Sequence, residues 1–301
     1  MNIQKRAMIC IIISVGLMVL ALLMSLFGFG INMGIDFAGG LRIKYEMGET
    51  FDLADVETAL QNAGMTESQI TQVGDAKTEL QIRVKSIGEK GVEELRASLE
   101  TELSAKYTQM KIHDADVSYV GGVASGTLVQ NAIFAVISAA ILMLIYIAIR
   151  FDPAMGAASV LGLMHDVLIM VAFMVFARGF VQMNSTFIAA MLTIVGYSIN
   201  NTIIIFDRIR ENAKKKTAIA MSSQEIVSLS IKQSLGRTIN TTLTTLCTIV
   251  ALYVLGVDSI KEFALPIIVG ILAGAYSANL INGYVWAFLR DTVPALSKKK
   301  K

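Results

Sequence analysis

Two adjacent side-chain amides, Asn200 and Asn201, lie in an otherwise apolar run that ends in a charged segment, Phe206–Asn212. The interior of a bilayer offers no water to such amides, so they must face other helices or a wet cavity. The run therefore predicts a membrane helix with a working interior. We expect the charged motif that follows, Asp207, Arg208 and Arg210, at the cytoplasmic end of this helix.

A carboxylate and an imidazole stand side by side in a second apolar run. Asp166 follows the expected start of its span near Gly156, which places it roughly 15 Å deep at about 1.5 Å per residue. Every other acid outside residues 28–126 falls in a loop or at the end of a span. An acid inside the membrane beside a histidine, here His165, is a candidate proton relay. The alternative is a hydrogen-bonding pair that only holds helices together.

A third polar pattern begins at Arg237. Its helical face continues at spacings of four, three and four through Thr241, Thr244 and Thr248. Tyr197 and Asn201 form a comparable face on the earlier span, next to Asn200. We expect these residues to form a polar seam between the two helices. Alternatively, Arg237 anchors the helix end by snorkelling, and the threonines hydrogen bond with their own backbone.

A glycine-rich motif with one acid, Gly34, Asp36, Gly39 and Gly40, follows the first apolar run. Glycine adopts backbone angles that other residues avoid, and a carboxylate can cap nearby amides. The simplest interpretation is a turn that leads into a strand.

The elements that position these motifs are membrane helices. The chain has 301 residues, 54% of them hydrophobic, and a mean hydropathy of +0.60, which is typical of a polytopic membrane protein. Six runs are long enough to span a bilayer, near 7–27, 127–149, 155–177, 185–206, 238–255 and 263–289. No P-loop, zinc motif or nucleophile triad is present, so we expect neither an enzyme nor a cofactor or metal site.

Charge divides the chain. Residues 28–126 hold 9 Lys and Arg against 16 Asp and Glu, whereas the flanks are basic. By the positive-inside rule the acidic segment is external and both termini are cytoplasmic. The expected parts are the N-terminus with the first span (1–27), an external domain (28–126), five further spans (127–290) with a cytoplasmic loop (207–237), and a basic cytoplasmic tail (291–301). The basic clusters indicate contact with membrane lipid rather than nucleic acid.

The external segment has the pattern of a small α+β domain. Strands are predicted at 41–47, 68–73, 79–84 and 115–120, and helices at 52–63 and 92–107, with Asp52 as an N-cap. The order βαββαβ predicts a ferredoxin-like sandwich.

These motifs together resemble the SecF proteins of the SecD/SecF family, in the RND superfamily. The resemblance is carried by residues 34–40, by His165–Asp166, by the run 196–212 and by Arg-Thr-Ile-x-Thr-Thr at 237–242. It implies a multi-pass protein of the bacterial cytoplasmic membrane that pairs with SecD and associates with the SecYEG channel. In that family the complex acts on the translocating preprotein and uses the proton-motive force.

One residue departs from the family pattern. Where Asn201 stands, SecF sequences usually carry an aspartate regarded as part of the ion-coupling site, with the arginine matched by Arg237. An amide does not exchange protons in the working pH range. Either Asp166 carries the proton, or coupling lies in SecD and this chain supplies Arg237 and a polar wall; we favour the second. The alternatives are a passive scaffold subunit and half of an RND-type exporter of small molecules or lipids, although exporters have larger external domains.

The orientation can be tested by labelling single cysteines. We expect Ser86→Cys to react with a membrane-impermeant thiol reagent in intact cells, because the acidic domain is external, and Ser297→Cys to stay unlabelled until the cells are broken. The opposite labelling pattern would overturn this topology.

Overall fold

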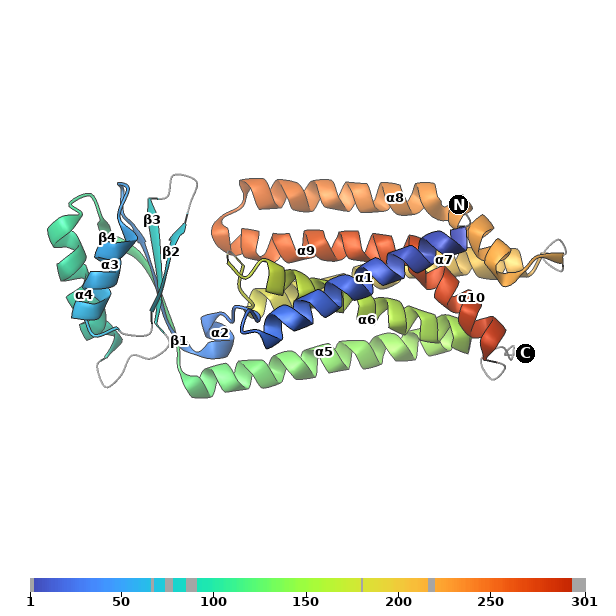
Figure 1. Ribbon diagram of the computed structural model, residues 1–301, viewed down its shortest axis with the longest axis horizontal. Helices are drawn as coiled ribbons and strands as arrows, with labels where there is room; N and C mark the ends of the chain where they lie inside the picture. Colours follow the sequence, from blue (N-terminus) through green and yellow to red (C-terminus); the bar gives the residue numbers. More distant parts are fainter. Residues whose placement is uncertain are drawn as a thin grey trace. The chain divides into compact units, whose positions relative to one another are not determined.

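A computed structural model describes residues 3–65, 68–73, 78–84, 91–179, 181–215 and 220–293 (Figure 1). The chain forms two compact units, residues 33–131 and residues 1–32 with 132–301. Each unit has its own hydrophobic core. The labelling sites at 86 and 297 and most of the basic tail lie outside the described residues.

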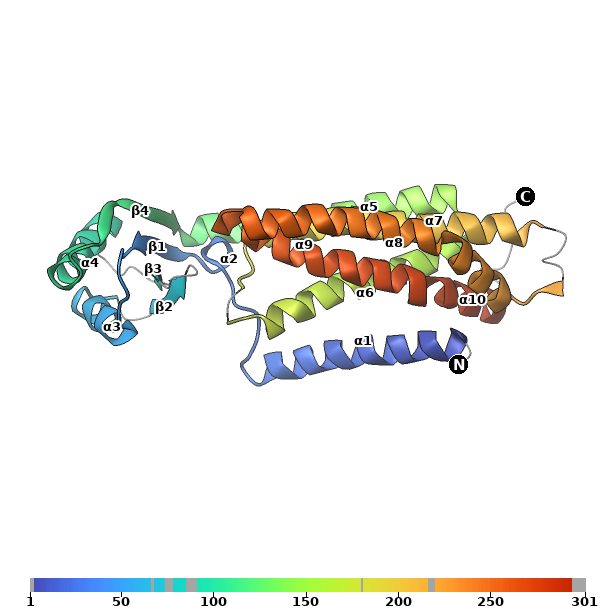
Figure 2. The same cartoon turned by 90° about the horizontal axis from the view of Figure 1, so that it is seen from above.

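The smaller unit is a four-stranded antiparallel sheet with the strand order β2-β3-β1-β4. Two helices, α3 and α4, cover one face of this sheet (Figure 2). The predicted ferredoxin-like order is confirmed, and β4 begins at Lys111 rather than Ala115. Its elements are α2 (Ile35–Ala38), β1 (Gly40–Glu46), α3 (Leu53–Asn62), β2 (Ser68–Val73), β3 (Glu79–Val84), α4 (Val92–Lys106) and β4 (Lys111–Val120).

Alternating side chains build the core of this unit. Every second residue of β1 and β3 is buried against the helices, because successive strand residues point to opposite faces. These residues are Leu41, Ile43, Tyr45, Leu80, Ile82 and Val84. Asp52 caps α3 as expected, since its side chain accepts a hydrogen bond from the Ala54 amide at 3.0 Å.

Polar contacts join α3 and α4, the two helices that cover the sheet. Asp55 on α3 pairs with Lys106 at 2.5 Å and accepts a hydrogen bond from the Tyr107 hydroxyl at 2.8 Å. The Lys106 ammonium and the Tyr107 hydroxyl lower the pKa of Asp55. The contact therefore weakens as the pH falls through that lowered pKa.

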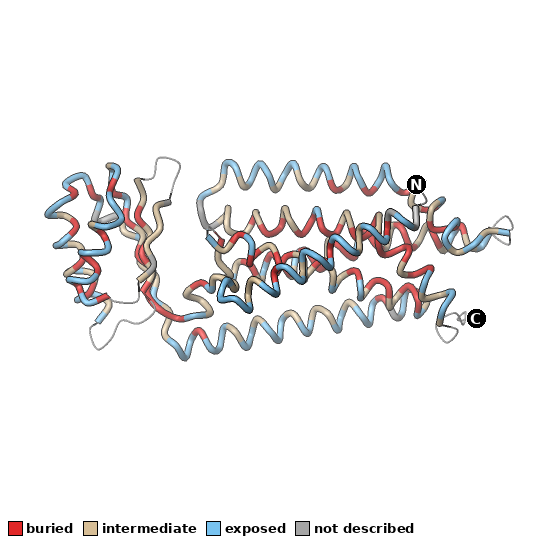
Figure 3. Tube along the Cα trace, in the orientation of Figure 1, coloured by how far each residue is buried: buried red, intermediate tan, exposed pale blue. Residues whose placement is uncertain are grey.

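Among the residues that the structure describes, six apolar helical segments are long enough to cross a membrane, so the chain is a multi-pass membrane protein. The helices α7 and α9 lie inside the bundle, whereas α5 and α8 are exposed along most of their length (Figure 3). The segments are α1 (Ile3–Leu26), α5 (Gly122–Arg150), α6 (Pro153–Phe176), α7 (Ser185–Ala213), α8 (Ser223–Leu255), and α9 (Asp258–Ser277), which a π-helical segment (Ala278–Asn282) joins to α10 (Gly283–Thr292).

The loop predicted at 207–237 is mostly helical. The helix α7 continues to Ala213, and α8 already begins at Ser223. A capping box starts α8: the Ser222 hydroxyl accepts from the Glu225 amide, and the Glu225 carboxylate accepts from the Ser222 amide. The charged residues that suggested a loop lie on helix ends beyond the apolar part of each span.

The independence of the smaller unit is testable with Ile82→Ala, which removes a fully buried side chain from its core. We expect a loss of about 2–5 kcal/mol in local stability. Hydrogen exchange of the full chain should then be faster at the β1 and β3 amides but unchanged in α6 and α9. Thr58→Ala on the exposed side of α3 is the control. Equal acceleration in both units would show that they unfold together.

Candidate functional site

The carboxylate of Asp166 is the centre of the polar interior. It is completely buried in α6 and accepts hydrogen bonds from Ser198 on α7 and from Ser277 on α9, the latter at 2.9 Å. The Nδ1 atom of His165 lies 2.8 Å from the other carboxylate oxygen of Asp166. Three helices therefore converge on one carboxylate, which satisfies a group that would otherwise be very costly in an apolar interior.

The neighbouring imidazole connects this centre to the first helix. The ring of His165 stacks on that of Tyr276, with centroids 6.0 Å apart. The hydroxyl of Tyr276 donates to the backbone carbonyl of Cys10 on α1 at 2.7 Å. Polar and aromatic contacts thus lead from Asp166 through His165 and Tyr276 to α1.

A π-helical turn brings two asparagines into the interior. Asn282 lies five residues after Ser277, a spacing that an ordinary helix places on a different face but that is close to one wide π turn. Its amide donates to Thr202 on α7 at 2.8 Å. Asn279 accepts a hydrogen bond from Thr238 on α8 at 3.0 Å. The π turn therefore ties α9 to both α7 and α8.

A glycine makes room for this arrangement. A Cβ atom at Gly162 on α6 would overlap the side-chain amide of Asn282. No larger residue fits there unless Asn282 moves away from Thr202. Gly162 and Asn282 are therefore matched by shape, which a sequence pattern does not reveal.

Of the two adjacent amides, one faces inward and one outward. Asn201 is completely buried, and neither of its polar side-chain atoms has a hydrogen-bond partner among the described residues. Asn200 is exposed. Arg237 is also exposed on α8, and no ion pair or hydrogen bond links its side chain to Asn201 in the part of the chain that the structure describes.

The prediction of a polar seam between the fourth and fifth spans is wrong about which face of α8 is buried. Thr241, Thr244 and Thr248 donate to their own helix backbone at 2.9–3.1 Å, and Thr244 and Thr248 are exposed. The buried polar face is instead a set spaced by four: Ser230, Ser234, Thr238 and Thr242. Spacing identifies the residues that share a face, but packing decides which face is covered. Tyr197 is half-buried, and its hydroxyl finds no hydrogen-bond partner within the part of the chain that the structure describes.

The charged motif lies near the end of α7 and contacts both α5 and α8. Asp207 binds Arg150 at the end of α5 at 3.2 Å and Arg210 at 2.9 Å. Arg208 donates to Gln233 on α8 at 2.8 Å. Both Arg150 and Arg210 also lie over the ring of Phe151. These contacts give the motif a structural role at one end of the bundle.

The glycine motif forms a tight entry into the sheet. Asp36 lies in the single turn of α2, which begins after Gly34. Gly39 (φ 73°) and Gly40 (φ 119°) have positive φ angles, and the Gly39 amide donates to the Ile35 carbonyl at 2.8 Å. Other residues rarely adopt such angles, so the interpretation as a turn into β1 agrees with the structure.

Several residues of the interior were not identified as site residues from the sequence: Ser198, Thr202, Ser277, Asn279 and Asn282. Single hydroxyl and amide groups are common in membrane helices, and only their convergence on Asp166 and the π turn distinguishes these. Within the described residues, no three His, Cys, Asp or Glu side chains gather as metal ligands would.

Profiles of a known protein family match two segments of this chain. The family profile described as "Protein export membrane protein SecD/SecF, C-terminal" matches residues 100–292. A second profile, "SecD/SecF GG Motif", matches residues 25–50, which include the turn at Gly39 and Gly40.

Individual relatives are similar over most of the chain. The chain is 35% identical to protein translocase subunit SecF of Thermodesulfovibrio yellowstonii over 251 residues, which cover 83% of this chain and 81% of that one. It is 36% identical over 259 residues to protein translocase subunit SecDF of Bacillus subtilis, covering 86% of this chain but only 34% of that relative. The chain thus spans about a third of the length of this SecDF relative.

A solved structure is similar as well. The crystal structure of SecDF, described as a translocon-associated membrane protein, from Thermus thermophilus has a TM-score of 0.82 and 32% sequence identity. The similarity covers 97% of this chain and 39% of that one.

The fit between Gly162 and Asn282 can be tested by Gly162→Ala. We expect a loss of about 1–3 kcal/mol in stability, because the added methyl group displaces a buried amide from its partner. The matched control is Gly196→Ala on α7, where a Cβ atom meets nothing within 4 Å. Thermal unfolding of the purified protein in detergent compares the two. Equal melting temperatures would show that Asn282 relaxes without cost.

Proposed function

Because this chain belongs to the SecD/SecF family of protein-export membrane proteins, we propose that it is a SecF-type auxiliary subunit of the Sec translocase that works with a SecD subunit. The family profile covers more than half of the chain, and the SecF relative is similar over most of both chains. We further propose that it sits in the bacterial cytoplasmic membrane near the SecYEG channel, with the α+β unit outside and both termini inside. The acidic α+β segment and its basic flanks support this orientation.

An exposed polar face on the membrane helix α8 supports the proposed pairing with a partner subunit. Arg237, Asn240, Thr244 and Thr248 share one face of α8 and are exposed, whereas the adjacent face of Ser234, Thr238 and Thr242 is buried. Asn200 on the neighbouring α7 is exposed as well. Arginine near a helix end can snorkel to water, but an amide deeper in the span cannot. A partner helix with polar groups would cover this face.

Our proposal for ion coupling rests on the contrast between the buried Asp166 and the exposed Arg237. Asp166 already has two hydroxyl donors and an imidazole within hydrogen-bond distance, so its local geometry suits a fixed connection between helices. In the described part of the chain, no ion pair joins Arg237 to an acid. We propose that Arg237 meets a carboxylate of the SecD partner, and that this chain supplies the cation and a polar wall rather than the proton carrier.

Proton-driven export in reconstituted vesicles tests this division of roles. We expect Arg237→Met to reduce export by about tenfold or more, because leaving one member of a buried charge pair alone costs about 2–5 kcal/mol. Lys232→Met, at another exposed position on α8, is the matched control and should leave export unchanged. We expect Asp166→Asn to reduce export within about threefold, the effect of roughly one hydrogen bond.

Two outcomes would contradict the proposal. Loss of coupling in Asp166→Asn with normal assembly would make Asp166 the proton carrier. Normal coupling in all of the variants would favour a passive scaffold, the alternative that the amide at Asn201 supports.

A further inference from the structure

The strand β2 is an outer strand of the sheet with an open edge. It pairs with β3 on one side only, and the described residues provide no strand on the other side. Its sequence, Ser-Gln-Ile-Thr-Gln-Val, contains neither a charged residue nor a proline. Strand edges of this kind can hydrogen bond with another extended chain, and proteins usually block them with charges, prolines or bulges.

The opposite edge of the same sheet carries such protection. In β4, Lys111 pairs with Glu46 at 2.9 Å, and Asp116 lies 3.6 Å from Arg42. The pairing of β1 with β4 is also irregular between Lys44 and Glu46. The contrast between the two edges suggests that the plain edge of β2 serves binding.

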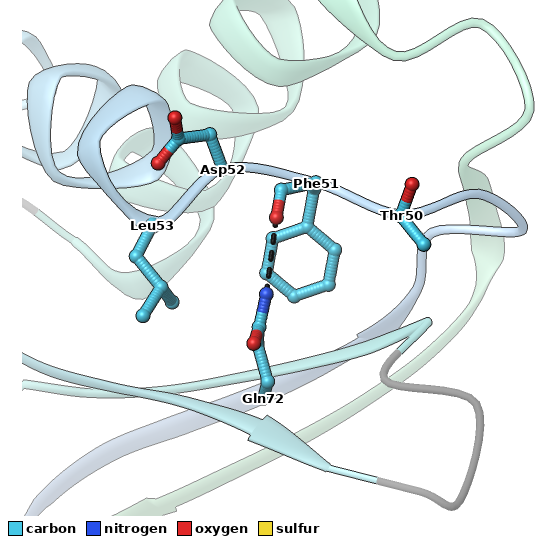
Figure 4. Close-up of a pocket in the computed structure, with 5 residues that line it drawn as sticks. All are labelled: Thr50, Phe51, Asp52, Leu53 and Gln72. Carbon is cyan, nitrogen blue, oxygen red and sulfur yellow. Dashed lines mark hydrogen bonds between the residues drawn. The ribbon is translucent and has the colours of Figure 1, made fainter.

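An open hollow of about 460 Å³ lies beside the end of β2. It is lined by Thr50, Phe51, Asp52, Leu53 and Gln72 (Figure 4). Gln72 donates to the Phe51 carbonyl at 3.0 Å, and the Asp52 amide donates to the Tyr107 hydroxyl at 3.1 Å. These two hydrogen bonds fix the segment that lines the hollow. Leu53 is 42% exposed, next to the exposed Asp52. An apolar surface beside a carboxylate suits a lysine or arginine side chain, which has an aliphatic stem and a positive end.

The charge of the surrounding segment agrees with this preference. Residues 45–76 contain seven acids and no lysine or arginine. Glu46 and Asp55 pair with Lys111 and Lys106, which leaves an excess of negative charge from the other five acids. A negative potential of this kind attracts positively charged partners and repels acidic ones.

We infer that the edge of β2 binds an extended, positively charged segment of the exported polypeptide as an added strand, with a lysine or arginine side chain in the hollow beside Asp52. The inference rests on the proposed function, because a translocase supplies an unfolded chain. Main-chain hydrogen bonds give affinity for almost any extended sequence, and the hollow adds a preference for basic residues. Such binding would hold a chain that has emerged outside the membrane.

The first experiment measures binding of a labelled peptide with alternating lysine and threonine to the full chain in detergent, by fluorescence anisotropy. N-methylation of alternate peptide amides should weaken binding by about tenfold, because it removes the donors needed for strand pairing. Asp52→Asn should weaken binding by about threefold, while asparagine still caps α3 and preserves the fold. Glu93→Gln, an exposed acid on α4, is the matched control. Equal binding of the methylated peptide, or no effect of Asp52→Asn, would overturn the inference.

The second experiment identifies the occupant. A photo-crosslinking amino acid is placed at Thr71 on β2, or at Ser118 on β4 as the control, in vesicles that hold a stalled exported chain. We expect crosslinks from position 71 to the exported chain and fewer from position 118. Crosslinks from position 71 to the SecD partner alone would overturn the inference and make this edge a subunit interface. If vesicles without this chain export equally well, the proposed function fails, whereas methylation-sensitive peptide binding would still support the strand-edge site.

Discussion

The larger unit depends on one constraint: a carboxylate buried among apolar helices must find hydrogen-bond donors inside the protein. Asp166 meets this constraint with hydroxyls from α7 and α9 and with the neighbouring His165. Because the donors belong to different helices, satisfying the carboxylate also sets how these helices rotate against α6. Ser198 and Ser277 share one carboxylate oxygen, so loss of both hydroxyls would leave that buried oxygen without either donor, which costs more than the hydrogen bonds themselves contribute. The carboxylate thus connects local chemistry to the arrangement of the bundle.

The π turn provides further polar contacts next to this carboxylate, at the end of α9. By widening one turn it directs Asn279 toward α8 and Asn282 toward α7, while Gly162 leaves space for the second amide. Such turns occur often at functional sites because they aim side chains that a regular helix would turn away. In this chain the π turn adds amide groups to the polar interior without adding another acid.

The polar face of α8 and the edge of β2 suit different kinds of partner. The polar face of α8 lies within a membrane helix, where lipid is a poor neighbour, so another membrane subunit is its natural complement. The edge of β2 lies in the α+β unit, where backbone groups are available to an extended chain. A subunit that binds a membrane partner through one unit and an exported chain through the other could connect events in the membrane with movement of the chain outside it.

The sequence alone determined much of this protein. Hydropathy and charge identified the six spans, and periodicity identified the strands and helices of the ferredoxin-like unit, including the cap at Asp52. These features follow from local composition and spacing. Only the tertiary structure decided which face of α8 is buried, which hydroxyls reach Asp166, and that α9 contains a π turn. Spacing along a helix fixes which residues share a face, but the rotation of that helix against its neighbours is set by packing between segments far apart in the chain. The buried amide of Asn201 and the exposed guanidinium of Arg237 show the difference: the sequence marked both as polar residues of a working interior, and packing separated them.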